Sequence, residues 1–137
     1  MDADIQGIIF YGFKLPRLVV DACDLNDKWA KEHCPPRPED RSDYKSPEWE
    51  EWRQKLREYE ATPCHVEIAW SGVEEEPQYY VHCPCCCKKV YWGEMLKLEP
   101  AQFFTEMDGA KQWLYAFCDR FNLPKSEPSW YLASRYF

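Results

Sequence analysis

Long apolar runs are missing from this sequence of 137 residues. A helix that crosses a bilayer needs roughly 18–20 consecutive apolar residues, and no run here approaches that length. The opening MDADIQGIIFYGF carries acids where a signal peptide carries bases, and no small-residue cleavage pattern follows it. We therefore expect a protein that makes no membrane contact and stays in the cytoplasm, where its thiols would remain reduced.

The motifs of several common enzyme classes are missing as well. The sequence contains no P-loop, no dinucleotide-binding glycine pattern, no H-E-x-x-H and no G-x-S-x-G. Because no other motif names a reaction, the sequence favours a non-enzymatic protein.

Basic residues are too few for an ordinary nucleic-acid-binding domain. Lysine and arginine total 17 against 24 acids, which gives a net charge of −7 and a pI near 5.0. A domain that grips phosphates usually carries a basic stripe, whereas the longest basic run here is Lys88-Lys89. Nucleic acid is therefore disfavoured as a partner, and the acidic balance suits either solubility or binding to a protein with a basic surface.

Aromatic residues, in contrast, are abundant. They make up 17% of a chain that is 45% hydrophobic, which is enough for one packed core. There is no internal repeat and no domain linker, so we expect residues 1–137 to form a single domain. The aromatics could fill the core or form a partly exposed contact surface. The candidates for such a surface are Tyr11, Trp49, Trp52, Tyr79, Tyr80, Tyr91 and Trp92.

Three helices are expected, at about residues 24–33, 47–61 and 100–121. Asp24 or Asn26 would cap the first helix. Ser46-Pro47-Glu48 supplies an N-cap, a helix-compatible proline and an acid for the start of the second. The third is expected to break at 108–109. Between the first two helices, the polar and proline-rich stretch at about 35–46 is expected to be an exposed loop.

Strands are expected over residues 5–13, 64–70, 78–83, 89–92, 94–98 and 128–137. A turn containing Ser71-Gly72 and three consecutive glutamates, Glu74, Glu75 and Glu76, joins the second strand to the third. The order of strand, helices, strands, helix and strand predicts an α+β fold with a mostly antiparallel sheet.

The apolar pattern of the second and third strands predicts their register. Matching their apolar faces would place two cysteines on the core side and two histidines on the outer side of the sheet. The expected pairs are Val66 with Val81, Ile68 with Tyr79, Cys64 with Cys83, and His65 with His82.

The cysteines predict a metal site. Cys83-Pro84-Cys85-Cys86 contains one C-x-x-C and resembles a zinc knuckle, although lysine stands where a knuckle commonly has glycine. A structural zinc would be held by Cys64, Cys83, Cys86 and Cys34, with Cys23, Cys85 or Cys87 as other choices for the fourth thiolate. The alternative is that the thiols are free, since unpaired cysteine packs as a small apolar side chain.

Two features suggest protein binding. The turn glutamates Glu74, Glu75 and Glu76 would contact a basic partner surface, and Trp49 and Trp52 would anchor the contact.

Two other functions stay open. One is a zinc-stabilised module that binds nucleic acid through Lys88, Lys89, Tyr91 and Trp92, because stacking beside a small basic patch can hold single strands. The other is an enzyme that uses a cysteine together with His65 or His82.

Three segments carry a resemblance to a known group. The opening IIFYGFKLP, the central EIAWSGVEEEPQYYV and the ending PSWYLASRYF are similar to small uncharacterised proteins encoded in tailed bacteriophage genomes. The resemblance leaves out the helix at 47–61 and the Cys83–Cys87 cluster. It implies a phage accessory protein in the host cytoplasm that binds and inhibits a host defence or nucleic-acid-handling complex.

Overall fold

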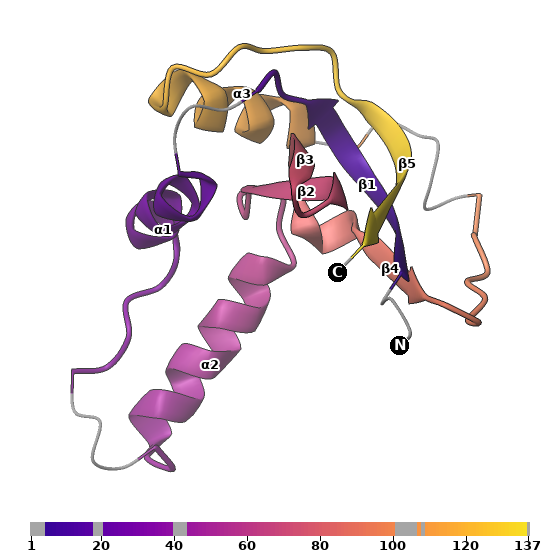
Figure 1. Ribbon diagram of the computed structural model, residues 1–137. Coiled ribbons are helices and arrows are strands. Elements are labelled where there is room, and N and C mark those ends of the chain that lie inside the picture. Colours follow the sequence, from indigo (N-terminus) through magenta and orange to yellow (C-terminus); the bar gives the residue numbers. More distant parts are fainter. Residues whose placement is uncertain (1–4, 18–20, 40–43, 101–106, 108, 137) are drawn as a thin grey trace.

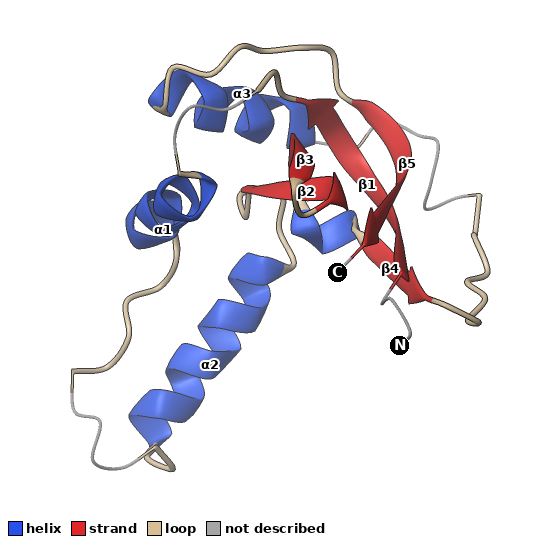
Figure 2. Cartoon of the chain, in the orientation of Figure 1, coloured by secondary structure: helices blue, strands red, loops and turns tan. Residues whose placement is uncertain are grey.

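The computed structural model describes residues 5–17, 21–39, 44–100, 107 and 109–136. Its elements form one mixed, mostly antiparallel sheet with three helices, which confirms the expected α+β fold (Figures 1 and 2). The strands are β1 (Ile5–Lys14), β2 (Glu67–Val73), β3 (Glu76–His82), β4 (Lys88–Tyr91) and β5 (Ser129–Tyr136). The helices are α1 (Ala22–His33), α2 (Pro47–Glu60) and α3 (Ala110–Arg120), with a short 3₁₀ turn, η1 (Pro84–Cys86).

Strand β1 lies at the centre of the sheet. One of its edges pairs with β5 along eight positions. Its other edge pairs first with β4 and then, towards its C-terminal end, with β3. Strand β3 also pairs with β2, and β2 reaches β5 through a single parallel pair, Gly72 with Arg135. The pairings therefore lead from β1 through β3, β2 and β5 back to β1, so the sheet closes on itself.

The cysteine-rich segment interrupts the edge formed by β3 and β4, which pair one after the other with the same side of β1. Phe13 pairs with Val81 and Ile9 pairs with Lys88, so four steps along β1 match seven steps along its partner. The three extra residues form the η1 turn between β3 and β4. Such bulges bend a strand and occur often at the rims of closed sheets.

Two apolar clusters lie on opposite faces of the sheet. The larger joins one sheet face to α1 and α3, with Leu25, Trp29, Leu114 and Phe117 among its buried helix residues. The smaller lies on the other face and contains Ile8, Phe10 and Tyr80, with the Phe10 and Tyr80 rings stacked at 3.8 Å. Alternate residues of β1 thus serve different clusters, as the pleat of a strand requires.

Helix α2 projects away from the sheet (Figure 1). The Ser46 hydroxyl caps it by accepting a hydrogen bond from the Trp49 N–H, and Pro47 stands in its first turn, as expected. Helix α1 is capped by Asp21 rather than by Asp24 or Asn26. Within the described part of the chain, no helix is both long and apolar enough to cross a membrane.

The predicted register of the hairpin is wrong by two residues. Ile68 pairs with Val81 and Trp70 with Tyr79, because pairing continues to Val73 and Glu76 and leaves a two-residue turn at 74–75. The φ angle of Gly72 is +87°, which a glycine adopts without strain. The apolar faces are still matched, since a shift of two keeps each side chain on its face.

The shift separates the predicted cysteine and histidine pairs. His82 lies opposite Glu67 rather than His65, and it is buried with only 4% of its surface exposed, although we expected it to face outward. Cys83 is buried in the core as expected, but Cys64 precedes β2 and has no partner across the hairpin.

One further element differs from expectation, since residues 94–98 do not form a strand. Helix α3 begins at Ala110, directly after Gly109 at φ +77°, where a break in the third helix was expected. The expected helical segment at 101–106 lies outside the described residues.

Candidate functional site

An apolar surface covers the end of the sheet built from β4, β1 and β5. Ile5 and Ile9 of β1 lie on the same face of the sheet as the larger apolar cluster, but at the end that α1 and α3 do not cover. On β5, Tyr136 pairs with Ile5 and Leu132 pairs with Ile9. The β1–β4 register continues to place Trp92 opposite Ile5, whose carbonyl accepts from the Trp92 N–H, so Trp92 follows the same face. The helices do not cover this half, since Trp92 is 80% exposed and Leu132 is 79% exposed. Large exposed apolar side chains gathered on one face are typical of protein contact sites.

The acidic turn of the β2–β3 hairpin lies beside the end of β5. Gly72 pairs with Arg135, which places the following residues, Glu74, Glu75 and Glu76, next to the C-terminal part of that strand. All three carboxylates are exposed. Within the described residues none of them takes part in an ion pair or a side-chain hydrogen bond. The three carboxylates of this turn thus border the apolar surface, whereas Lys88, opposite Ile9, lies within it.

Trp49 does not occupy the exposed position we expected. It is 6% exposed, with the rings of Tyr44 and Trp52 packed against it. Trp52 is half-buried, since its indole N–H donates to the Pro35 carbonyl and Arg37 lies over its ring. These contacts tie the proline-rich loop to α2, so Trp49 is not available as an anchor in this structure. Tyr11 and Tyr80 are buried too, whereas Tyr91 and Trp92 are exposed.

The residues of the candidate nucleic-acid patch lie on two faces. Lys88, Lys89, Tyr91 and Trp92 are all exposed along β4 and just beyond it. Successive side chains of a strand alternate, so Lys89 and Tyr91 share one face and Lys88 and Trp92 share the other. The four residues therefore do not form one continuous patch.

The cysteines of the predicted zinc site lie in different surroundings. Burial raises the pKa of the Cys83 thiol to about 12, and its sulfur lies 3.5 Å from the Pro63 carbonyl. The Cys86 sulfur lies 3.2 Å from the Cys83 carbonyl, and Cys34 and Cys64 are half-buried. Among the residues that the structure describes, no three His, Cys, Asp or Glu side chains converge as a metal site requires. The zinc site stays a prediction, which metal analysis of untagged protein would test.

Cys85 differs from the other thiols of the segment. Its neighbour Cys86 and the charge of His65 together lower the pKa of Cys85 to about 7, despite partial burial. The pKa of Cys86 is raised in turn, chiefly by its interaction with Cys85 and by burial. Cys85 is therefore the cysteine of this turn with the most thiolate at neutral pH.

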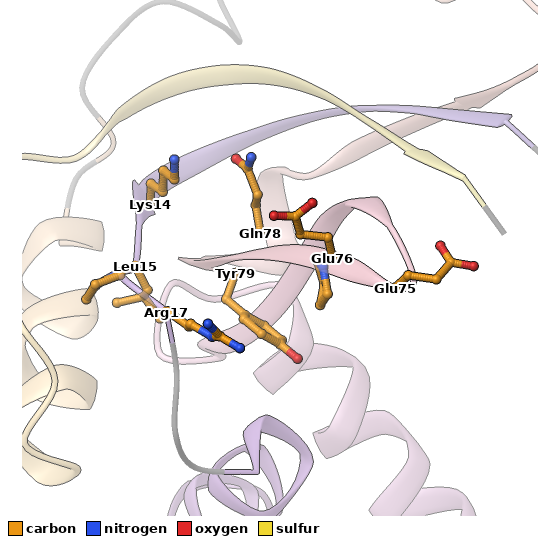
Figure 3. Close-up of a pocket in the computed structure, with 9 residues that line it drawn as sticks. Lys14, Leu15, Arg17, Glu75, Glu76, Gln78 and Tyr79 are labelled. Atoms are coloured by element: carbon orange, nitrogen blue, oxygen red, sulfur yellow. The ribbon is translucent and has the colours of Figure 1, made fainter.

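A cleft of about 570 Å³ lies between the end of β1 and the start of β3 (Figure 3). Its polar side chains do not converge on one point, because they leave the strands on opposite sides. Lys14, Glu76 and Gln78 extend to one side, whereas Arg17 and Tyr79 extend to the other. The cleft therefore lacks the convergent polar groups of a ligand site.

A smaller cavity brings together groups that the sequence did not connect. His65 Nε2 lies 2.9 Å from Glu67 Oε1, and the Tyr59 ring lies 5.3 Å from the His65 ring. The hydrogen bond to His65 is the main cause that lowers the pKa of Glu67. Burial alone would lower the pKa of His65, but the bond to Glu67 and the charges of Glu67 and Glu60 raise it. The H-x-E spacing along one strand face was the only sequence signal for this pair.

Comparisons with known proteins add no assignment: no family model, no curated protein and no solved structure matches the chain.

Proposed function

We propose that this protein is a non-enzymatic binding domain whose partner is a protein with an apolar patch bordered by basic residues. The observation that carries the proposal is the exposed face of Trp92, Leu132 and Tyr136 beside the unpaired glutamates of the β2–β3 turn. The contact would centre on the apolar residues, with the carboxylates at its rim.

The two parts of this surface have different physical roles. Aromatic and aliphatic anchors that leave water supply most of the binding free energy at protein interfaces. Exposed charges at a rim mainly speed association and select the partner's charge. A net charge of −7 acts in the same direction as the turn, since it attracts a basic surface from a distance.

The resemblance to phage accessory proteins suggests the class of partner. A host complex that handles nucleic acid carries a basic surface for phosphate. A negatively charged protein docked on that surface would block it. The proposal is therefore an inhibitor of a host defence or nucleic-acid-handling complex that acts through protein contact.

The test compares partner recovery from a bacterial host lysate between matched variants. Trp92→Ser combined with Leu132→Ser removes both anchors, and we expect it to abolish recovery of a partner that the wild-type protein retains. Met95→Ser is the control, because Met95 is 99% exposed but lies outside the strand face. Equal recovery by the anchor variant and the control would overturn the assignment of this surface.

The electrostatic part needs its own variants. Glu74→Gln, Glu75→Gln and Glu76→Gln together remove three charges from the turn, and Glu48→Gln, Glu51→Gln and Glu58→Gln remove three from α2. We expect only the turn variant to slow association, with the difference fading at high salt. Equal association rates for the two variants would remove the acidic turn from the proposal.

A gel shift separates this function from the nucleic-acid alternative. We expect no shift of single-stranded DNA or RNA at micromolar protein and low salt. A shift that Lys88→Gln with Lys89→Gln abolishes would overturn the protein-binding proposal in favour of that alternative.

A further inference from the structure

A cavity of about 230 Å³ lies where α1, α2 and the start of β2 meet. Its walls combine apolar and polar side chains from α1 and the residue after it, from α2, and from the segment that leads into β2. The lining residues are Asn26, Trp29, Ala30, Cys34, Leu56, Tyr59, Glu60, His65, Val66 and Glu67.

Two polar atoms of the lining are buried without a hydrogen-bond partner. They are the Tyr59 hydroxyl and His65 Nδ1, and they belong to rings that lie 5.3 Å apart. The Glu60 backbone acts on the pKa of His65 and the Trp29 indole acts on that of Tyr59, but neither meets the geometry of a hydrogen bond to these two atoms. Leaving a buried polar atom unpaired costs roughly 1–3 kcal/mol, so a molecule that pairs both atoms would be stabilised here.

The other polar groups of the cavity already have partners. The two ends of the Asn26 amide bond the backbone of Ile68, and the Trp29 indole N–H donates to the Cys64 carbonyl. The Glu67 carboxylate accepts a hydrogen bond from His65 Nε2–H. Two hydrogen-bonding atoms on neighbouring rings, one on Tyr59 and one on His65, are therefore left for a ligand.

The cavity favours an uncharged ligand. Burial raises the pKa values of the Tyr59 hydroxyl and the Cys34 thiol, so both stay neutral at pH 7. The Glu67 carboxylate is already paired with His65. The carboxylates of Glu60 and Glu67 in the lining disfavour an anion, and a buried cation would find only the paired Glu67 and the solvent-exposed Glu60 as counter-charges.

We propose that this cavity binds a small uncharged molecule that carries a hydrogen-bond donor and acceptor side by side, as a primary carboxamide does. The amide N–H₂ donates to His65 Nδ1, and the carbonyl accepts from the Tyr59 hydroxyl. When His65 is protonated, the carbonyl accepts from Nδ1–H as well. The Trp29 ring with Leu56 and Val66 packs against an apolar group of the ligand.

The size and the chemistry of the cavity limit what it does. Sites for drug-sized molecules run from about 300 to 1,000 Å³, so this cavity takes a smaller molecule. The raised pKa of Cys34 leaves that thiol without the thiolate that nucleophilic catalysis requires. The site is therefore one for binding, and it is independent of the apolar surface on β4, β1 and β5.

Benzamide is the probe for this proposal. We expect saturable binding to the full-length protein, followed by the ¹⁵N shift of His65 Nδ1 and by the change in total tryptophan fluorescence. Tyr59→Phe removes the hydroxyl and keeps the ring, and we expect it to weaken binding about tenfold, the loss of one hydrogen bond. Tyr79→Phe is the control, because Tyr79 lies at the other cleft, and we expect it to leave the affinity unchanged.

The outcomes are distinct. Failure of benzamide to shift the Nδ1 resonance at 10-fold excess over about 1 mM protein would overturn the proposal. Equal affinity of the wild-type, Tyr59→Phe and Tyr79→Phe proteins would show adventitious stacking and overturn it too. Toluene, which matches the ring but has no amide, is expected to bind at least tenfold more weakly, and equal binding of toluene and benzamide would contradict the proposed chemistry.

Discussion

Gly12 packs directly against the backbone of Val81 where β1 meets β3. A Cβ atom added to Gly12 would overlap the Val81 carbonyl oxygen and lie 2.9 Å from the Cα atom of His82. Because both contacts are backbone atoms of a paired strand, neither can move without breaking the β1–β3 pairing. This contact fixes how closely the sheet can close on itself.

Gly12→Ala is therefore expected to lower the free energy of unfolding by at least about 2 kcal/mol. Gly7→Ala on the same strand is the control. The nearest atom to a Cβ there would be a methyl group of Val90, at 3.1 Å, and a side chain can shift; the Val90 carbonyl oxygen lies at an ordinary contact distance of 3.8 Å. We expect Gly7→Ala to change the free energy by less than about 1 kcal/mol. Urea denaturation measures both, and equal effects would contradict the close approach at Gly12.

The buried His82 predicts loss of stability in acid. Burial is the main cause that lowers the pKa of His82 to about 4, whereas the unfolded chain takes up the proton near 6.5. The unfolded state therefore binds more protons between these two pH values. The contribution of neutral His82 to the free energy of unfolding is therefore complete above pH 6.5. It falls by up to about 3 kcal/mol as the pH drops towards 4.

His82→Phe tests this pH dependence. The substitution removes the titrating group and keeps a ring beside Phe10 and Tyr80, whose rings pack edge-on against His82. Between pH 6.5 and 4 we expect the variant to lose less stability than the wild-type protein. The charges that also act on His82, those of Glu67, Lys89, His65 and Arg135, are present in both proteins. Parallel pH profiles would mean that His82 is not buried in its neutral form.

The His65–Glu67 pair titrates with the opposite sign. The pKa of His65 is raised above 6.5, so the contribution of its proton to stability is complete below pH 6.5 and is lost as the pH rises through the folded pKa. Glu67→Gln removes the main cause of this rise and leaves burial, which lowers the pKa. We expect a proton NMR titration to place His65 above 6.5 in the wild-type protein and below that value in the variant. Glu60→Gln is the control for a charge that makes no side-chain hydrogen bond to the ring, and it is expected to cause a smaller decrease.

The thiols should differ in their rate of alkylation. Cys85, with its lowered pKa, is expected to react with iodoacetamide at pH 7 before the buried Cys83 and Cys118, whose pKa values burial raises. Cys86→Ala removes the neighbour that lowers the pKa of Cys85 and should slow its labelling several-fold. Cys86→Ser keeps a donor and should slow it less. Peptide mapping by mass spectrometry identifies the labelled thiol, and equal rates in both variants would contradict the role of Cys86.

Local sequence signals predicted the elements that depend on neighbouring residues. Ser46 and Pro47 set the start of α2 because a cap and a helix-compatible proline act within one turn. The β-branched and aromatic run at 5–13 predicted β1, and the apolar alternation predicted which faces of β2 and β3 meet the core. The acidic turn was also visible, since three adjacent glutamates must lie near one another.

Other features needed contacts between distant residues. The register of the hairpin depended on how far pairing continued towards 74–75, and matched faces alone allow shifts of two. Burial of Trp49 follows from the way the proline-rich loop folds back on α2. The exposed face of Trp92 and Leu132 exists because the helices cover only part of the sheet, which no periodicity records.

The sequence by itself determined the order of strands and helices that defines the fold class, the start of α2 and the negative charge of the hairpin turn, because each depends on residues within a few positions of one another. The tertiary structure decided which aromatics are exposed, where the cysteines lie and which groups meet at His65. Those outcomes depend on packing between segments far apart in the sequence, such as Arg135 against Trp70 and Ile5 opposite Tyr136. The pattern along the chain does not specify that packing.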